Sequence, residues 1–545
     1  MFLRAALATL LLGVLPLYAD ITLDEIRSKP PSNARNFMIW QYLDQNITSA
    51  QADEAFYLVH NVGQRMFFAY AQKSDRPEVA YTVQCMKMGV KELIRTDDSG
   101  CAKLAVSVGK LSAMHKDARA RVVDLVGDPG LKTAAEVLDD TNLSAHYRQY
   151  SPALFLRVYN GSYGDSKRRQ FNFIPDYDYM QALAKAPGFT TAVMSTINDE
   201  KLSKFGWALT KVDAVEGLDP RGLFYLGLNQ LLRGSKSRAI ELFQRSGDKA
   251  YYQSDKDKAL FWQALASEKN DLMWKLLAQS WDINFYTLYA MEKTGTFPEN
   301  YYSQLQTSDA VSDLNLSDPF VWNELLDTIG RTPKNELYAL AKRYDAKNLV
   351  PLQSFIIEKA SRYRLQGYVM PYDAELTDVD TDTKAIIYAL MRQESRFIPA
   401  ALSHSYALGL MQMMPFLCRA MDGQVDCGRE TLFDMFDPHI NLLYAKPHIA
   451  WLQYRVYHPL FIAYAYNGGI GFTKRYLLDD KFNPGPYEPF LSMELMRTTE
   501  TREYGKKVLT NYVVYKKILG EPVSLIDLCE TLLHPSKTDR FRKTK

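Results

Sequence analysis

The sequence predicts an all-α protein of several domains, and three observations support this fold class. Apolar residues recur at three-and-four spacing in Ser49 to Gln72, Arg221 to Ser246 and Asp257 to Ser280, as in amphipathic helices. Runs of alternating β-branched residues bounded by hairpin turns are nearly absent. The length of 545 residues exceeds what one hydrophobic core organises and indicates about three units.

The first part of the chain, residues 20–340, is predicted to be an N-terminal α-superhelix, or solenoid. The clearest repeat unit is a helical hairpin in which Leu223 to Leu231 and Ala239 to Phe243 are apolar, with Gly234 and Ser235 at the turn. Stacked units of this kind bury a continuous core. Residues 341–380 form a helical linker, residues 381–533 a compact α-helical block, and residues 534–545 a basic tail. We expect this tail to be solvated and frayed.

Residues 1–19 have the pattern of an export signal. Arg4 provides a basic start, an apolar run too short to span a bilayer follows, and Ala19 precedes the expected cut. The alternative is an uncleaved N-terminal anchor. Beyond residue 20 no apolar stretch is long enough to cross a membrane. The sequence therefore predicts a protein of the periplasm with no integral membrane segment.

The five cysteines fit an oxidising compartment. We expect Cys85 to pair with Cys101 and Cys418 with Cys427, because each pair closes a short loop. Cys529 is then left unpaired. No CxxC motif is present, which argues against a redox site or a cysteine zinc site.

Charge and motif content exclude several classes of function. Lys and Arg number 65 against 63 Asp and Glu, so the overall charge does not suggest a nucleic-acid partner. His404, His439, His448 and His458 lack the spacing of metal ligands, and neither GxSxG nor a Walker loop is present. We expect no metal and no other cofactor.

The helix predicted from Thr383 to about Arg396, with Asp382 as its N-cap, places a carboxylate on an apolar stripe. Ile386, Leu390 and Glu394 are four residues apart and share one face. Burial disfavours a charged carboxylate, so the pKa of Glu394 is expected to rise toward the range of a general acid. Taken alone, a carboxylate at a helix end is more commonly paired or exposed than catalytic.

Three further motifs follow Glu394-Ser395 in order. They are Gly409-Leu410-Met411-Gln412-Met413-Met414-Pro415, then Ala465-Tyr466-Asn467-Gly468-Gly469, then Glu500-Thr501-Arg502-Glu503-Tyr504. Together, the four elements make the chain resemble family 1 lytic transglycosylases of the soluble type, in which a helical superhelix precedes a catalytic domain like goose-type lysozyme. The motifs cover about residues 380–520. The segment Ser405 to Leu408 is bulkier than the small turn that is usual in this family.

The resemblance implies roles for seven residues. Glu394 would be the catalytic acid/base, and Ser403 would hydrogen-bond its carboxyl group. Gln412 and Met414 would line the groove around the scissile sugar. The residues implied beside the catalytic group are Tyr466, Asn467 and Glu500.

Several of these positions also have a structural interpretation. Gly468 and Gly469 are typical of a helix C-cap, and methionines commonly fill cores. Asp437-Pro438 is typical of a helix start, whereas Pro447 should kink or break the helix that follows. Arg502 could form a structural ion pair with Glu500.

The reaction implied by the resemblance needs only one enzyme carboxylate. The acid protonates the leaving oxygen between N-acetylmuramic acid and N-acetylglucosamine, then takes a proton from the muramic 6-hydroxyl, which closes a 1,6-anhydro ring. A hydrolytic muramidase and a non-catalytic peptidoglycan-binding scaffold are the alternatives. Glycan strands of peptidoglycan are the expected partner, with other cell-wall enzymes as further candidates, and the protein is expected to be a monomer. A fragment of residues 370–545 is expected to keep some cleavage.

Overall fold

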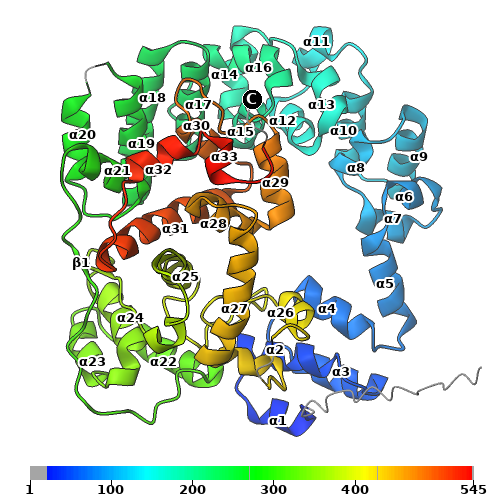
Figure 1. Ribbon diagram of the computed structural model, residues 1–545. Coiled ribbons are helices and arrows are strands. Elements are labelled where there is room, and N and C mark those ends of the chain that lie inside the picture. The colour runs from blue at the N-terminus through cyan, green and yellow to red at the C-terminus, as the bar shows by residue number, and fades with distance from the viewer. Residues whose placement is uncertain (1–20, 269, 426–427, 543–545) are drawn as a thin grey trace, which may run out of the picture. The chain divides into compact units, whose positions relative to one another are not determined.

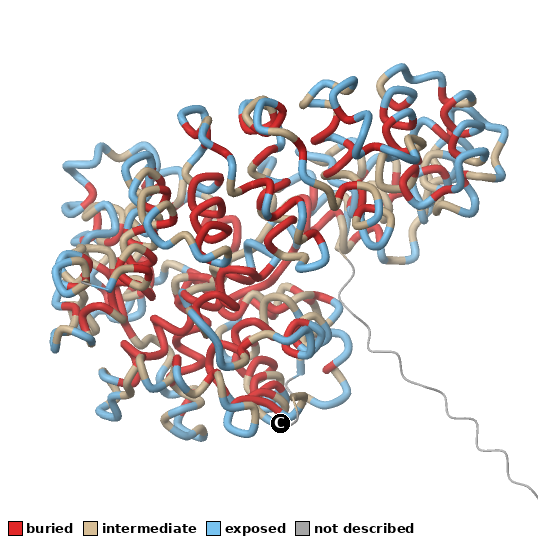
Figure 2. The backbone as a smooth tube through the Cα atoms, turned by 90° about the horizontal axis from the view of Figure 1, so that it is seen from above, coloured by how far each residue is buried: buried red, intermediate tan, exposed pale blue. Residues whose placement is uncertain are grey.

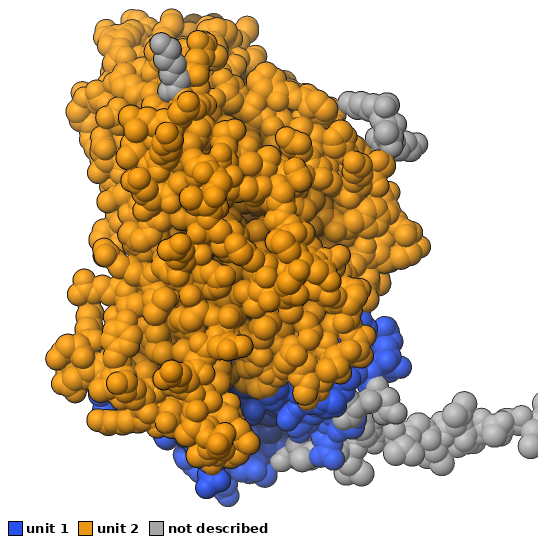
Figure 3. Space-filling view, turned by 60° about the vertical axis from the view of Figure 1, so that its left-hand side comes forward, with its two compact units in different colours: residues 1–74, 312–332, 394–447 blue, residues 75–311, 333–393, 448–545 orange. Residues whose placement is uncertain are grey.

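The computed structural model describes residues 21–268, 270–425 and 428–542, and its fold is all-α as predicted. The described residues divide into two compact units, each built from segments that are distant in sequence (Figure 3). Unit 1 comprises residues up to 74, 312–332 and 394–447, and unit 2 comprises residues 75–311, 333–393 and 448–545. The predicted signal at residues 1–19 lies outside the described residues. Within them, no helix combines the length and apolarity that a bilayer crossing requires.

Unit 1 is the smaller of the two, and its regular elements in the described residues are helices. Its elements are α1 (Leu23–Ser28), α2 (Asn33–Tyr42), α3 (Ser49–Tyr57), α4 (Gln64–Ala71), α22 (Pro319–Arg331), α26 (Pro415–Met421), the 3₁₀ helix η6 (Leu432–Phe436) and the greater part of α27 (Pro438–Gln453). Asp437 accepts a hydrogen bond from the Ile440 N–H (3.1 Å) and so caps α27, as predicted. The helix runs through Pro447 without ending, so of the two expected effects, a kink or a break, the break does not occur.

The first part of unit 2 is a succession of short helices. They are α5 (Pro77–Lys87), α6 (Val90–Arg95), α7 (Ser99–Ala105), α8 (Val108–Ser112), α9 (Lys116–Val126), α10 (Pro129–Asp139), α11 (Leu143–His146), η1 (Tyr147–Gln149), α12 (Pro152–Gly161), α13 (Gly164–Phe171), α14 (Tyr177–Lys185), α15 (Phe189–Ile197), η2 (Glu200–Leu202), α16 (Ser203–Ala208), η3 (Leu209–Lys211), α17 (Pro220–Leu232), α18 (Lys236–Lys249), α19 (Gln253–Ala266), α20 (Asp271–Ala278) and α21 (Phe285–Lys293). Buried residues recur along these helices (Figure 2). The unit therefore has the repeated helix-on-helix packing that the sequence predicts for a solenoid.

The second part of unit 2 contains two very short strands, β1 (Tyr301–Tyr302) and β2 (Gln366–Gly367), which pair in parallel. Its helices are α23 (Leu337–Arg343), η4 (Lys347–Leu349), α24 (Val350–Ala360), η5 (Asp373–Leu376), α25 (Thr381–Glu394), α28 (Pro459–Gly468), α29 (Ile470–Leu478), α30 (Phe490–Glu494), α31 (Thr499–Ile518), α32 (Leu525–Thr531) and α33 (Pro535–Thr538). Glu394, the last residue of α25, belongs to unit 1.

The helical hairpin predicted around Gly234 is confirmed as α17 and α18, which pack side by side (Figure 1). Asp219 caps α17 by accepting from the Gly222 N–H, and Pro220 occupies the first helical position. Gly234 has φ of 88°, a left-handed conformation that a glycine adopts without steric cost.

Two of the predicted long helices are each a pair of short ones. Ser49 to Gln72 is divided into α3 and α4, because the buried Asn36 side chain accepts from the His60 N–H (2.9 Å) and holds the chain in a loop between them. Asp257 to Ser280 is divided between α19 and α20. The Asn270 amide donates to the carbonyl oxygen of Ala264 (2.9 Å), near the C-terminal end of α19.

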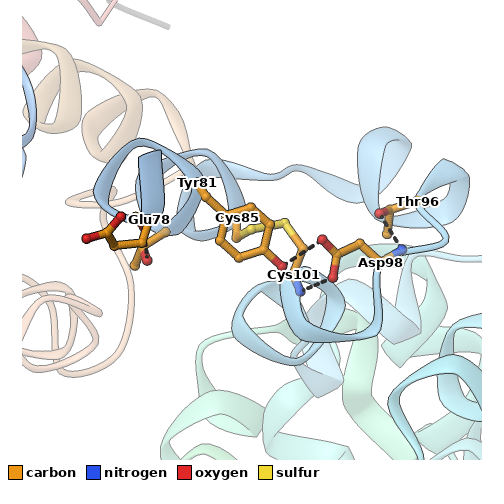
Figure 4. Close-up of a disulfide and its surroundings, with 7 residues drawn as sticks. Glu78, Tyr81, Cys85, Thr96, Asp98 and Cys101 are labelled. Atoms are coloured by element: carbon orange, nitrogen blue, oxygen red, sulfur yellow. Dashed lines mark hydrogen bonds between the residues drawn. A yellow bond between two sulfur atoms is a disulfide. The ribbon is translucent and has the colours of Figure 1, made fainter. Parts of the chain in front are cut away.

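The predicted disulfide between Cys85 and Cys101 is confirmed, with a Cα–Cα distance of 4.8 Å (Figure 4). It joins α5 to α7. Asp98 supports the same junction, since it caps α7 through the Cys101 N–H (3.0 Å) and accepts from the Tyr81 hydroxyl (2.6 Å). Cys427, the predicted partner of Cys418, lies outside the described residues. The unpaired Cys529 is buried.

The basic tail is not frayed as far as Arg542, contrary to the expectation. The Arg540 guanidinium lies 3.6 Å from the centroid of the Tyr454 ring. Arg542 pairs with the buried Asp539 (2.9 Å) and donates to the carbonyl oxygen of Phe482 (3.0 Å). These arginines are held by stacking and by backbone acceptors, neither of which a charge count reveals.

Candidate active site

Helix α25 is fixed at both ends. Its N-cap is Asp380, which accepts from the Thr383 N–H (2.7 Å), so the prediction of Asp382 as the cap was wrong. Asp382 lies in the first turn and instead pairs with Lys516 (2.7 Å). Near the other end, every residue from Ala385 to Arg392 is buried.

Arg392 anchors the C-terminal end of α25 and was missed by sequence reasoning. Its guanidinium donates to the carbonyl oxygen of Gly367 (2.8 Å), Asn511 (2.9 Å) and Glu358 (3.1 Å). It also lies 4.1 Å from the centroid of the Tyr368 ring. A buried, fully paired cation holds the helix end rigidly, two residues before Glu394. The importance of Arg392 comes from these partners, which the sequence pattern does not reveal.

Glu394 is half-buried at the end of α25. Ile386 and Leu390, which precede it on the same face, are fully buried, so the apolar stripe leads to a carboxylate that is partly open to solvent. Arg396 and Phe397 follow it in left-handed conformations, with φ of 50° and 68°. Non-glycine residues adopt such conformations at a cost, and they concentrate at functional sites.

The loop after Glu394 is organised around one carbonyl oxygen. Ala401 accepts from the Gly409 N–H (2.9 Å) and from the side-chain amide of Gln412 (2.9 Å). Gln412 also has a left-handed backbone, with φ of 47°. The Ser403 hydroxyl oxygen accepts from the Ala407 N–H (2.9 Å), closing the turn between them. Gln412 and Ser403 thus shape this loop.

Asn441 supports the same loop from α27 and was also missed by sequence reasoning. It is fully buried, accepts from the Met411 N–H (2.9 Å) and donates to the carbonyl oxygens of Leu408 (3.0 Å) and Met435 (2.7 Å). Gly409 has φ of 72°, and a Cβ atom there would overlap Asn441 and the Met435 carbonyl group. Nothing in the spacing of Asn441 distinguishes it from other polar residues of a helix.

The methionines of the loop differ in burial, in line with the groove role implied for Met414 and the core-filling role that is common for methionine. Met411 and Met413 are buried and fill the core of unit 1, whereas Met414 is half-buried and forms the N-cap position of α26. Glu394, Ser403, Gln412 and Met414 therefore all belong to unit 1.

Tyr466, Asn467 and Glu500 belong to unit 2, where α28 packs against α31 (Figure 1). The Asn467 amide donates to a carboxylate oxygen of Glu500 (3.2 Å), and its oxygen accepts from the Thr501 hydroxyl (2.7 Å). Glu500 is exposed and sits in the first turn of α31, where the helix dipole favours a negative charge.

Two details of this helix pair test the structural interpretations. Gly469, with φ of 83°, follows the last residue of α28 as its C-cap, as predicted. The suggested ion pair between Arg502 and Glu500 is not what the structure has, because Arg502 pairs with its neighbour Glu503 (2.9 Å).

Histidines of this block have packing and capping roles. The His448 ring lies 5.6 Å from that of Tyr466, and burial lowers the pKa of His448. His458 caps α28: its Nδ1 atom accepts from the Leu460 N–H (3.1 Å), while Nε2 lies 2.9 Å from the carbonyl oxygen of Leu528. This pattern requires a neutral ring with the proton on Nε2, and burial accordingly lowers the pKa of His458 to about 4.

Comparison with known proteins identifies the segment that carries these residues. Residues 374–485 match the family described as the Transglycosylase SLT domain. This segment is similar to the SLT domain. The match includes Glu394, Gln412 and Asn467 and ends before Glu500.

Two curated relatives of this chain are named as lytic murein transglycosylases. Membrane-bound lytic murein transglycosylase C of Cronobacter sakazakii is 28% identical over 248 residues, which are 38% of this chain and 66% of that protein. A Haemophilus influenzae protein named as a soluble lytic murein transglycosylase is 31% identical over 163 residues, 29% of this chain and 27% of that protein. The chain therefore spans less than two thirds of the length of these relatives.

Two solved structures resemble nearly the whole chain. The lytic transglycosylase Slt of Pseudomonas aeruginosa, as an inactive mutant, matches 91% of this chain and 83% of its own, with a TM-score of 0.50 and 15% identity. The 70 kDa soluble lytic transglycosylase Slt70 of Escherichia coli matches 95% and 90%, with a TM-score of 0.50 and 16% identity. At these identities the likeness concerns the fold.

Proposed function

We propose that this protein is a peptidoglycan lytic transglycosylase, which cleaves the β-1,4 bond between N-acetylmuramic acid and N-acetylglucosamine and leaves 1,6-anhydro-muramic ends. The observation that carries the proposal is the position of Glu394 inside the SLT domain. This half-buried carboxylate ends a rigidly anchored helix, and two left-handed residues, Arg396 and Phe397, follow after Ser395. The lytic transglycosylases among its relatives support the same reaction class.

Glu394 would act first as an acid and then as a base. In its protonated form it gives a proton to the glycosidic oxygen, and that bond to the muramic anomeric carbon breaks. The resulting carboxylate takes the proton of the muramic 6-hydroxyl as its oxygen bonds to the anomeric carbon. The proton is returned to Glu394, so the cycle closes without water or a second enzyme carboxylate. We predict that partial burial raises the pKa of Glu394, which keeps the acid form available.

The remaining six residues are proposed to bind the sugar rings or to orient the Glu394 carboxyl group. Gln412 and Met414 would line the groove at the scissile bond, and Ser403 would hydrogen-bond the Glu394 carboxyl group through its hydroxyl proton. On the other helix pair, the hydrogen bond from Asn467 to Glu500 would fix both polar groups beside Tyr466. A glutamate held by an amide is a positioned acceptor for sugar hydroxyls.

The test is the mass of the products that the full chain releases from purified peptidoglycan. A transglycosylase gives disaccharide-peptides that are lighter by one water than those a hydrolytic muramidase gives. Anhydro products from the wild type would support the proposal. Reducing muramic ends would favour the muramidase, and no release of fragments would favour a non-catalytic scaffold.

The proposed place of action is the periplasm, where the peptidoglycan lies. The export pattern of residues 1–19 and the periplasmic setting of the substrate support this localisation. The array of helices in unit 2 is proposed to guide glycan strands or to position other cell-wall enzymes, with the protein acting as a monomer. On cell fractionation, we expect osmotic shock to release the full chain, while a cytoplasmic marker stays in the cells.

A further inference from the structure

Unit 1 contains a groove of about 700 Å³ that none of the seven proposed site residues lines. Its walls come from α2, the segment between α3 and α4, α22 and the loop around His404 and Tyr406. This loop continues the turn that Ser403 closes through Ala407. The groove therefore borders the loop that follows Glu394 but is a separate surface.

Helix α22 supplies acidic groups to the groove. Phe320, Asn323, Glu324 and Asp327 line it, and their spacing of three and four residues places them on one helical face. A different face of α22 buries Trp322, Leu325 and Ile329 in the core of unit 1.

The α22 carboxylates are not committed to strong internal pairs. Both Glu324 and Asp327 are exposed, and Asp327 has only a loose partner, Arg331, at 3.7 Å with both side chains largely in solvent. An exposed pair of this kind contributes little to stability. These carboxylates can therefore serve a ligand.

The other elements supply basic and aromatic groups. Arg65 donates to the carbonyl oxygen of Ser405, and its guanidinium lies 5.7 Å from the centroid of the Tyr406 ring. His60 and His404 are exposed at the same groove. Tyr406 is fixed by Phe37 and Trp40, whose ring centroids lie 5.3 and 5.4 Å away. The bulky residue at Tyr406, which departs from the small turn usual in the family, thus builds this wall.

Carboxylates, a guanidinium and imidazoles in one groove match a ligand that carries both charges. A neutral sugar offers no opposite charge to Glu324 and Asp327, and a polyanion is repelled by them. A short peptide with a free amine and free carboxylates satisfies both sets of groups. Its carboxylates suit Arg65, and its ammonium suits the carboxylates of α22.

We propose that this groove binds the peptide that is attached to the glycan strand, through its free side-chain amine and its carboxylates. The inference rests on the proposed function, because it takes peptidoglycan as the substrate. The groove would then add affinity for strands that carry peptides, while the bond cleaved remains the one at Glu394.

The test compares two substrates: glycan strands that carry tetrapeptides with a diamino acid, and the same strands stripped of peptides by an amidase. The variant is Glu324→Gln/Asp327→Asn, and the charge-matched control is Asp313→Asn/Glu336→Gln, at exposed carboxylates that do not line the groove. Thermal unfolding of all three proteins establishes that the fold is retained.

We expect kcat/KM of the groove variant to fall by about tenfold on peptide-bearing strands, the value of a lost charge-assisted interaction, and by less than about twofold on stripped strands. Acetylating the free amine of the peptide should lower kcat/KM of the wild type by the same factor of about ten. It should leave kcat/KM of the groove variant unchanged. An equal loss on both substrates, or no loss on either, would overturn the proposal.

Direct binding separates this inference from the proposed function. Titration of the free tetrapeptide into the wild type and the groove variant should show weaker binding to the variant, whether or not the protein cleaves strands. Absence of cleavage by the wild type on both substrates would contradict the proposed function. Equal binding of the tetrapeptide by the wild type and the groove variant would contradict the proposed binding of the peptide in the groove.

Discussion

The backbone beside Glu394 adopts conformations that side chains disfavour. Arg396, Phe397 and Gln412 are all left-handed, and each such residue costs about 1–2 kcal/mol. The surrounding hydrogen bonds offset this cost. The Ala401 carbonyl oxygen accepts two hydrogen bonds from the loop, and the Asn441 side chain accepts another from the Met411 N–H. A loop held in this way keeps its geometry when a substrate binds, which favours reaction at a fixed carboxylate.

Replacing Gly409 by alanine should weaken this loop. The left-handed φ costs alanine about 1–2 kcal/mol, and overlap with Asn441 and the Met435 carbonyl costs about 1–3 kcal/mol more. We expect Gly409→Ala to lower the free energy of unfolding by about 2–5 kcal/mol in a denaturant titration. Gly423→Ala is the control, because a Cβ at that exposed glycine meets nothing within 4 Å. Equal stability of both variants would show that the loop tolerates movement.

At the scale of elements, α28 depends on a neutral histidine at its start. His458 is 2% exposed and accepts the Leu460 N–H at Nδ1, an atom that cannot accept once it is protonated. The same helix carries Tyr466 and Asn467 in its last turn. Its stability should therefore depend on pH.

The direction of this dependence follows from the pKa of His458, which is about 4 in the folded protein against 6.5 ordinarily. Between these pH values the unfolded chain binds the proton and the folded chain does not, so stability rises with pH through this window. The stabilisation is complete above pH 6.5 and is lost as the pH falls toward 4, by about 3 kcal/mol in all.

His458→Gln should remove this part of the pH dependence. We expect the wild type to exceed the variant in unfolding free energy at pH 7, and the difference to narrow by up to about 3 kcal/mol at pH 4. His534→Gln, at an exposed histidine with no side-chain capping bond, should leave the pH profile of the wild type unchanged. If the difference in unfolding free energy between wild type and His458→Gln were constant from pH 4 to 7, a neutral His458 as the cap of α28 would be contradicted.

Local patterns made some elements predictable from sequence and left others hidden. The hairpin at Gly234, helix α25 with Glu394 at its end and the C-cap at Gly469 all follow from periodicity and turn residues. The division of Ser49 to Gln72 into two helices depends on Asn36, a residue distant in sequence. Periodicity cannot reveal such a contact.

The candidate site shows the same division. The motif residues could be selected by type and order, since acid/base chemistry requires a carboxylate and the neighbouring motifs have a fixed sequence. Arg392 and Asn441 could not be selected from the sequence, because their importance lies in the partners that the fold brings to them. The tail at Arg540 and Arg542 was misjudged for this reason as well.

At the scale of the whole molecule, buried charges tie the C-terminal helices to the preceding array within unit 2. Lys506 of α31 pairs with Glu494 (2.9 Å) and contacts the Tyr286 hydroxyl of α21 (2.7 Å). The backbone N–H of Leu525 donates to Glu292 of the same helix (2.7 Å). Removing one partner from a buried pair leaves an uncompensated charge, which costs about 3–5 kcal/mol.

A fragment of residues 370–545 should therefore not fold as the intact chain does, which revises the expectation that it keeps some cleavage. It lacks Glu358 and Gln366, partners of the buried Arg392, as well as Tyr286 and Glu292. We expect low helix content and no cooperative thermal transition by circular dichroism. The full chain, measured alongside, should unfold cooperatively. A fragment with the same melting temperature as the full chain would show that these contacts are dispensable.

In the proposed reaction, the Glu394 carboxyl group carries the proton in both steps of cleavage. The direct measurement is the initial rate at which purified peptidoglycan is solubilised by the wild type, by Glu394→Gln and by the control Glu430→Gln, an exposed glutamate of the same unit. We predict that Glu394→Gln keeps the melting temperature of the wild type but loses at least about 10³-fold in rate, while the control stays within about twofold. Solubilisation by Glu394→Gln at the rate of the wild type would contradict the acid/base role of Glu394.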